Sequence, residues 1–211
     1  YSTNTQGWFP WIFDQCHMEE HSTVLEIGCG DGSLWLENKE KIPKQLHVVL
    51  SDISEGMLRD TRRAIHANVK TSRFDFQVFD CERIPYPDNS FDLIIANHIL
   101  FYCKNLTSVF EEISRVLKTG GTFVCSTYGS AHMKEINELV SEFDDRIVLS
   151  ADRLFERFGK ENGADLLAPY FQNIKWLSYE DSLHVTEPET LISYVLSCHG
   201  NQNQYIIDHY K

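Results

Sequence analysis

The sequence lacks any apolar run near the roughly 18 residues that a membrane-spanning helix needs, and no signal peptide opens it. Its six cysteines include no CxxC pair and no other metal-ligand spacing, which argues against a zinc site or a disulfide framework. Low-complexity tracts and linkers rich in proline, glycine or serine are also missing. We therefore expect a cytoplasmic protein with no membrane span and no metal site, folded as one domain over residues 1–211.

Basic charge is scarce. The chain carries 19 Lys and Arg residues against 31 Asp and Glu residues, for a formal net charge of −12. Proteins that bind nucleic acid normally present a basic face to the phosphates. The densest basic stretch, residues 59–70, is thin and is diluted by Asp60. The charge balance argues against nucleic acid as a partner.

Short runs of β-branched residues alternate with longer stretches of helical periodicity, a pattern typical of an α/β fold with a parallel sheet. The expected strands are Thr23–Ile27, Leu46–Ser51, Phe74–Phe79, Phe91–Ala96 and Thr122–Thr127. The expected helices cover residues 31–39, 54–68, 105–118 and 131–144, and glycines 120 and 121 stop the third of them.

Outside residues 23–144 the sequence pattern no longer alternates between apolar strands and helices. Residues 161–169 predict a short helix, 171–180 and 181–187 two closely linked strands, and 188–198 a final helix. Strands joined so tightly must be antiparallel, because a parallel pair needs a crossover connection. Near the start, Trp8 and Trp11 share a helical face that either packs on the sheet or covers a binding cleft.

The strongest motif is Val24–Gly32, where an apolar strand runs into glycines 28, 30 and 32 and then into a helix. Glycines permit a tight turn and let the main chain approach a ligand without an intervening Cβ. The motif alone is weak evidence for any one ligand, since nicotinamide and flavin proteins also use glycine-rich strand–turn–helix units. Its spacing is GxGxG after Glu26, and not the GxGxxG of dinucleotide sites.

Two acids follow the next two strands. Asp52 ends the second strand, where a carboxylate can accept hydrogen bonds from both hydroxyls of a ribose. The alternative role for Asp52 is a helix N-cap, for which Ser54 competes. Asp80 closes the third strand, where it either accepts from an exocyclic amine of adenine or serves as a turn residue.

Together these stretches resemble the class I S-adenosylmethionine-dependent methyltransferases, and within them the enzymes related to ubiquinone and menaquinone biosynthetic methyltransferases (the type 11 group). The likeness covers about residues 20–130. It is carried by Leu25–Gly32, by Leu50–Leu58, by Asp80 with Ile84–Asp92, and by Val116–Gly121.

That resemblance implies a Rossmann-like fold: a seven-stranded, mostly parallel sheet of order 3-2-1-4-5-7-6 with strand 7 antiparallel and helices on both faces. It implies a cofactor-binding core at about 20–130, an N-terminal lid helix within 1–19 and a substrate-side segment at 131–211. It also implies S-adenosyl-L-methionine as cofactor. The implied cofactor contacts are Glu26, Gly28, Cys29, Gly30, Asp52, Ile53, Met57, Asp80, Cys81 and Asn97.

Methyl transfer from a sulfonium is an in-line displacement, so the enzyme mainly aligns the nucleophile with the methyl group. A general base is needed only if the acceptor must lose a proton. Candidates near the cleft are His98, Tyr102, Tyr128 and His132. For His98 three roles stay open: a base, a packing residue for substrate or cofactor, and a structural residue.

We expect a small-molecule methyltransferase. The Asn/Asp-Pro-Pro-Tyr/Phe signature of many amino-directed methyltransferases is replaced here by residues 97–100, Asn-His-Ile-Leu. The alternatives are a macromolecule (tRNA or protein) methyltransferase, a non-catalytic regulatory protein that binds S-adenosylmethionine, and a nicotinamide-binding oxidoreductase. A basic surface beside the cleft would favour tRNA, and a cofactor panel separates the last alternative.

Overall fold

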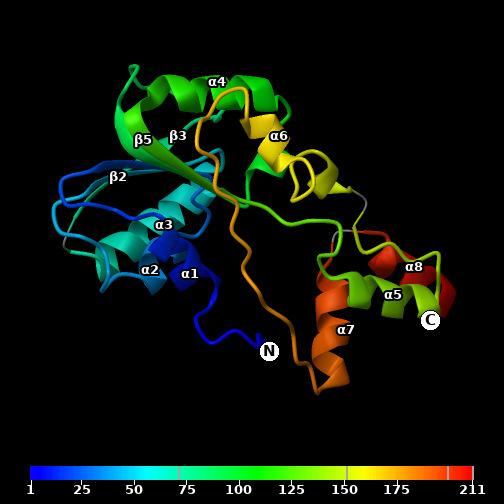
Figure 1. The fold of residues 1–211 in the computed structure, drawn as a ribbon. Coiled ribbons are helices and arrows are strands. Elements are labelled where there is room, and N and C mark those ends of the chain that lie inside the picture. The colour runs from blue at the N-terminus through cyan, green and yellow to red at the C-terminus, as the bar shows by residue number, and fades with distance from the viewer. Residues whose placement is uncertain (71, 151, 199, 211) are drawn as a thin grey trace.

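A computed structural model of the chain describes residues 1–70, 72–150, 152–198 and 200–210. In these residues five strands form one parallel sheet in the order β3-β2-β1-β4-β5 (Figure 1). The strands are β1 (Thr23–Ile27), β2 (His47–Asp52), β3 (Arg73–Val78), β4 (Phe91–Asn97) and β5 (Leu117–Ser126). The α/β class and the arrangement of the first five strands are confirmed.

Eight α-helices and two 3-10 turns accompany the strands in the part of the chain that the structure describes. They are α1 (Trp8–Gln15), α2 (Ser33–Glu37), α3 (Glu55–Asn68), η1 (Leu100–Tyr102), α4 (Leu106–Val116), α5 (Lys134–Phe143), η2 (Leu154–Glu156), α6 (Gly163–Leu167), α7 (Pro188–Ser197) and α8 (Gln202–Tyr210). None of the described helices is long and apolar enough to cross a membrane.

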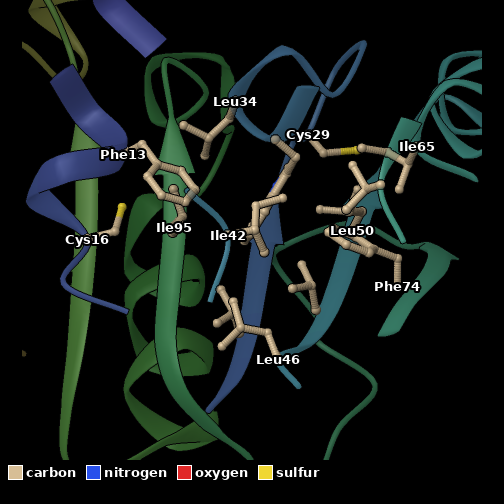
Figure 2. Packing of buried hydrophobic residues seen from close by; sticks show 14 of the residues in the cluster. Phe13, Cys16, Cys29, Leu34, Ile42, Leu46, Leu50, Ile65, Phe74 and Ile95 are labelled. Atoms are coloured by element: carbon tan, nitrogen blue, oxygen red, sulfur yellow. The ribbon is translucent and has the colours of Figure 1, made fainter. Parts of the chain in front are cut away.

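The sheet is buried on both faces by two separate core clusters. Successive residues of a strand point to opposite faces, so neighbours in one strand join different clusters. In β1, Val24 joins a core cluster with α1, α2 and α3, whereas Leu25 joins a second cluster with α4. Figure 2 shows part of the first cluster, in which Phe13 lies near Ile95 and Leu50 near Phe74. A strand buried on both faces reads as a continuous apolar run, which is why β1, β2 and β4 are recognisable in the sequence.

The two further strands expected at 171–180 and 181–187 are absent, so the seven-stranded sheet was wrong for these residues. Residues 171–187 run as an extended segment from α6 to α7 (Figure 1). Their side chains at Ile174, Trp176 and Leu177 are exposed, so they offer the sheet no buried face. The single antiparallel bridge in this region pairs Leu183 with Ser2 and not with β5.

The third expected helix is shorter and the fifth strand longer than predicted. Helix α4 stops at Val116, and β5 begins at once with Leu117, five residues earlier than its sequence pattern suggests. The strand starts this early because Leu117 pairs with Phe91 of β4, and the Lys118 ammonium next to it binds both carboxylate oxygens of Asp92 at 2.8–2.9 Å. Gly120 and Gly121, which were predicted to stop the helix, lie inside β5, and Gly120 has a left-handed φ of 81°.

Residues 1–4 and 180–184 form a clasp between the start of the chain and the extended segment 171–187. The Asp181 carboxylate accepts from the hydroxyls of Ser2 and Thr3 and from the amides of Thr3 and Asn4, at 2.8–3.3 Å. Thr3 N also donates to Ser182 O at 2.8 Å. This N-terminal clasp uses the main-chain groups that a sheet strand would have used, which explains why residues 181–184 do not join the sheet.

The last helices lie apart from the sheet. In Figure 1, α5, α7 and α8 gather at one end of the molecule, beyond the extended segment 171–187. Asp144, which follows α5, accepts from Arg146 at 2.8 Å and from Tyr210 Oη of α8 at 2.6 Å. Helix α8 was not predicted, because Gln202–Tyr210 has a weak apolar pattern.

Candidate functional site

The glycine loop begins where β1 ends. Gly28, Gly30 and Gly32 all take left-handed φ angles, of 69°, 54° and 80°, which residues with a Cβ adopt only with strain. The loop is held from outside: Cys29 N donates to Ser51 O at 2.9 Å, and Thr61 Oγ1 donates to Gly30 O at 2.6 Å. The sequence pattern correctly predicts a tight turn leading into α2.

The three glycines differ in what surrounds them. A Cβ at Gly28 would lie 2.4 Å from Ile99 Cγ2, and one at Gly32 would lie 2.8 Å from Thr61 Cγ2. A Cβ at Gly30 would meet nothing within 4 Å. Gly28 and Gly32 are therefore required by packing within the protein, whereas Gly30 borders open space.

A cavity of about 230 Å³ lies over this loop. It is lined by Trp8, Phe9, Glu26, Gly28, Cys29, Gly30, Asp31, Ser33, Leu34, Asn97 and His98. Of the predicted cofactor contacts, five line the cavity: Glu26, Gly28, Cys29, Gly30 and Asn97. The candidate catalytic residue His98 shares it, so the structure brings the glycine loop and the end of β4 together.

The other predicted contacts lie along the same edge of the sheet, outside the cavity lining. Asp52 ends β2 next to β1, and Asp80 follows β3. In a parallel sheet the carboxyl ends of neighbouring strands share one edge, with about 4.8 Å between strands. Asp80 is exposed, and so are the side chains of Ile53 and Met57. The edge of the sheet beyond the cavity is thus acidic and open.

Asp52 supports the glycine loop. Its Oδ2 accepts from Gly30 N at 3.1 Å and its Oδ1 from Ser54 N at 2.8 Å. Ser54 caps α3 by accepting from Met57 N, so Asp52 is not the cap. A carboxylate offers about four lone-pair positions, and these contacts leave positions free for a ligand.

Asp80 retains part of its turn role. Its Oδ1 accepts from Glu82 N at 2.9 Å, and its main-chain carbonyl accepts from Arg83 N at 2.9 Å. Both bonds fix the bend after β3. The second carboxylate oxygen has no partner in the described residues, so Asp80 keeps an acceptor at the sheet edge.

Glu26 is the buried acid of the cavity, with 2% of its surface exposed. Burial raises the pKa of Glu26 to about 8, and the nearby carboxylates of Asp31 and Asp52 act in the same direction. Trp35 Nε1 donates to Glu26 Oε2 at 2.6 Å, which fixes the orientation of the carboxyl group. Near neutral pH the group is held mainly in its protonated form, unless a positive charge enters the cavity.

Asn97 connects three parts of the chain. Its Oδ1 accepts from Ser126 Oγ at 2.6 Å and from Trp8 Nε1 at 3.3 Å. Ser126 Oγ in turn accepts from His98 N at 3.0 Å. Sequence reasoning did not place Trp8 among the site residues, although the Trp8–Trp11 helical face was the signal that could have found it.

His98 has an unusual backbone. Its φ of 55° is left-handed, a conformation that costs a non-glycine residue energy and is concentrated at functional sites. Its half-buried ring packs against Trp8, with 4.9 Å between ring centroids. Burial lowers the pKa of His98 to about 4, and nearby His132 adds to the effect. The ring is therefore neutral at physiological pH.

Further rings continue from His98 away from the cavity. Phe101 lies 6.2 Å from His98 and 5.1 Å from Tyr128, and Tyr128 lies 4.9 Å from His132. Tyr102 packs on Phe101 at 4.7 Å, but 65% of its surface is exposed. The predicted catalytic candidates thus form one aromatic run, with Tyr102 at its outer side.

The low pKa of His98 has a measurable consequence. A histidine kept neutral by the fold takes up its proton more readily in the unfolded chain, so it lowers the free energy of unfolding as the pH falls from about 6.5 to about 4. We expect the His98 ring resonances in NMR spectra to stay unchanged between pH 8 and about 5. The variant His98→Gln identifies the resonances, and a titration midpoint near 6.5 would contradict the burial.

Comparison with known proteins decides the family. Residues 25–125 match the family profile described as methyltransferase domain. The demethylmenaquinone methyltransferase of Symbiobacterium thermophilum is 31% identical over 120 residues, covering 57% of this chain and 48% of that protein. Residues 25–125, the stretch that the profile covers, belong to the class I S-adenosylmethionine-dependent methyltransferases. The recognition made from the glycine loop and the two acids is confirmed.

A second relative is the malonyl-[acyl-carrier protein] O-methyltransferase of Nitrosospira multiformis. It is 30% identical over 135 residues, covering 58% of this chain and 44% of that protein. The chain thus spans about half the length of the curated relatives that it matches. The likeness identifies the family and its cofactor, S-adenosylmethionine.

Solved structures agree on the fold of the chain. The YcgJ protein of Bacillus subtilis superposes with a TM-score of 0.63 at 19% identity, over 95% of this chain and 82% of that one. Phosphoethanolamine N-methyltransferase 2 of Haemonchus contortus, solved with S-adenosyl-L-methionine, gives 0.57 at 23% identity, over 78% and 36% of the two chains. At such identities these structures show the fold alone.

Proposed function

We propose that the protein transfers a methyl group from S-adenosylmethionine to a small-molecule acceptor bound beside His98. The observation that supports this proposal most directly is the open space at Gly30, in a cavity that buried Glu26 and Asn97 also line. Only Gly30 of the three loop glycines keeps its Cβ position free of protein atoms. That space fits a ligand lying directly on the main chain.

The residues present fit the cofactor along the whole edge of the sheet. Glu26, the glycine loop with Cys29, and the main chain at Asn97 would hold its methionine end in the cavity. Asp52 would accept from the ribose hydroxyls, with Ile53 and Met57 beside the nucleoside, and Asp80 and Cys81 would contact adenine. When bound, S-adenosylmethionine supplies an electrophilic methyl group on a sulfonium sulfur.

The acceptor side is formed by the aromatic run from Trp8 and His98 to Tyr128. We propose that the neutral His98 ring orients the nucleophile of the acceptor. A pKa of about 4 makes His98 a weak base, since a general base works best with a pKa near the working pH. Burial raises the pKa of Tyr128, so its hydroxyl keeps its proton and can donate a hydrogen bond to the acceptor.

Charge and the relatives favour a small acceptor over a macromolecule. The net charge of −12 opposes a nucleic-acid partner, whose binding needs basic contacts to phosphates. One relative is named for demethylmenaquinone, a small molecule, which favours an acceptor of that kind. Another is named for malonyl-[acyl-carrier protein], in which a carrier protein bears the small malonyl group. The single-domain organisation, with residues 1–19 as lid and 131–211 on the substrate side, and a cytoplasmic location stay part of this proposal.

The first test is binding of the demethylated cofactor, S-adenosylhomocysteine. A ligand that binds only the folded state stabilises it, by about 2.7 kcal/mol at 100 times the dissociation constant. We expect a clear rise in melting temperature with S-adenosylhomocysteine and none with NAD. A rise with NAD alone would overturn the proposal.

A second test uses Glu26. The positively charged amine of the cofactor favours the carboxylate form, so binding should release about one proton from Glu26 at pH 7. For the same reason, affinity should rise with pH up to about 8 and then level off. Calorimetry in two buffers with different ionisation enthalpies measures the released proton. Glu26→Gln should release none, and equal proton release by both proteins would contradict the assignment.

A further inference from the structure

Two thiols face each other at the nucleoside end of the proposed cofactor site. The sulfur atoms of Cys81 and Cys103 are 3.5 Å apart. Cys81 lies just after β3, and Cys103 is the residue after η1. Both side chains are half-exposed, whereas Cys16 and Cys29 are buried.

The two thiols differ in acidity. The hydrogen bond from the Cys81 thiol lowers the pKa of Cys103, and the same contact raises the pKa of Cys81. Cys103 is therefore the thiol that ionises first, and a thiolate is the nucleophilic form. Burial raises the pKa of Cys125 and of Cys16 to about 12, so these two cysteines are poor nucleophiles.

The position of the pair links two segments of the site. Cys81 directly follows Asp80, the residue proposed to contact adenine. Cys103 follows the segment that begins with His98, and Asn105 N donates to Glu82 Oε1 at 2.9 Å. The loop after β3 and the start of α4 are therefore already held together. A disulfide has a bond of about 2.05 Å, so its closure requires the sulfurs to approach by about 1.5 Å.

We propose that Cys81 and Cys103 form a redox site, in which a hydroperoxide converts the two thiols into a disulfide that weakens cofactor binding. The Cys103 thiolate attacks a peroxide oxygen, which gives a sulfenic acid and releases an alcohol, or water from hydrogen peroxide. The Cys81 sulfur then attacks the Cys103 sulfur, and the displaced hydroxide takes up the remaining thiol proton as water. Two thiols are oxidised by two electrons, and one peroxide bond is reduced.

Weaker binding follows from the movement that closure requires. Drawing Cys81 toward Cys103 displaces the chain at Asp80 from the adenine position, whereas the glycine loop and Asp52 are untouched. We expect the dissociation constant for S-adenosylhomocysteine to rise about tenfold, the size expected when roughly one hydrogen bond to the base is lost. This part rests on the proposed function; formation of the disulfide does not.

The experiment treats the reduced, full-length protein with hydrogen peroxide, caps free thiols with N-ethylmaleimide and maps unreduced peptides by mass spectrometry. We expect a Cys81–Cys103 peptide, and titration of S-adenosylhomocysteine should show the weaker binding, restored by dithiothreitol. Cys103→Ser should bind S-adenosylhomocysteine equally well before and after peroxide. Cys198→Ser, which removes a distant half-exposed thiol, should respond like the unaltered protein.

Three outcomes would overturn the redox site. Both thiols could still react with N-ethylmaleimide after peroxide treatment, the disulfide could leave the affinity for S-adenosylhomocysteine unchanged, or the loss of affinity could persist in Cys103→Ser. If the reduced protein fails to bind S-adenosylhomocysteine, the proposed function fails first. The peptide map then still decides whether the two thiols join, so the two failures are distinguishable.

Discussion

Replacing Gly30 with leucine should abolish cofactor binding in a protein that remains folded. The new side chain meets no protein atom within 4 Å of its Cβ, so it can occupy the open space beside the cavity. A ligand that lies on the Gly30 main chain would have to displace it. We expect the affinity for S-adenosylhomocysteine, measured by calorimetry, to fall at least about a hundredfold, which corresponds to about 2.7 kcal/mol.

Gly120 provides a matched control. It also has a left-handed φ, of 81°, and an open Cβ position, but it lies in β5 and not at the cavity. A leucine in this conformation costs about 1–2 kcal/mol of backbone strain at either position. Gly30→Leu and Gly120→Leu should therefore lose similar melting temperature, while only the first loses binding. Equal binding by both variants would refute the role of Gly30.

Asp52→Ala should lower cofactor affinity about ten- to a hundredfold, because a hydrogen bond to a charged group is worth about 1.5–3 kcal/mol. The carboxylate lost is the proposed acceptor for the ribose hydroxyls, and it also holds Gly30 N at 3.1 Å. Both effects weaken binding in the same direction. Calorimetric titration with S-adenosylhomocysteine measures the loss without a known acceptor.

Glu55→Ala serves as the control for Asp52→Ala. Glu55 is an exposed acid in the first turn of α3, three residues along the chain, so its removal changes the net charge equally. We expect its affinity to stay within about twofold of the unaltered protein, since an exposed charge contributes little. A loss of the same size in both variants would mean that general electrostatics, and not a ribose contact, explains the effect.

The core of the fold was predictable because its signals are local. β1 was predicted with its observed bounds, Thr23–Ile27, since an apolar run followed by glycines has few alternatives. The edge acids follow from the same reasoning, because strand ends of a parallel sheet share one edge. Other helix and strand bounds shifted by at most five residues. The largest shift was at Leu117, where the Lys118–Asp92 contact lies outside any local pattern.

The missed features depend on distant contacts. Residues 181–184 look like a strand, but Asp181 and its neighbours bond to residues 2–4 and not to the sheet. The left-handed backbone of His98 has no sequence signal, since such a φ is rare without glycine. Likewise, the difference between Gly28 and Gly30 depends on where Ile99 lies. The site roles themselves stay predictions until binding is measured.

The N-terminal clasp has a consequence for where the functional unit begins. The family likeness starts at residue 25, yet Trp8 lines the cavity, and Tyr179 packs on both Trp8 and Trp11 with 5.3 Å between ring centroids. A fragment cut to the boundaries of the family likeness would lose one wall of the cavity and the anchor of the extended segment. Substitutions at residues outside the shared motifs, such as Trp8, can therefore change the shape of the cavity.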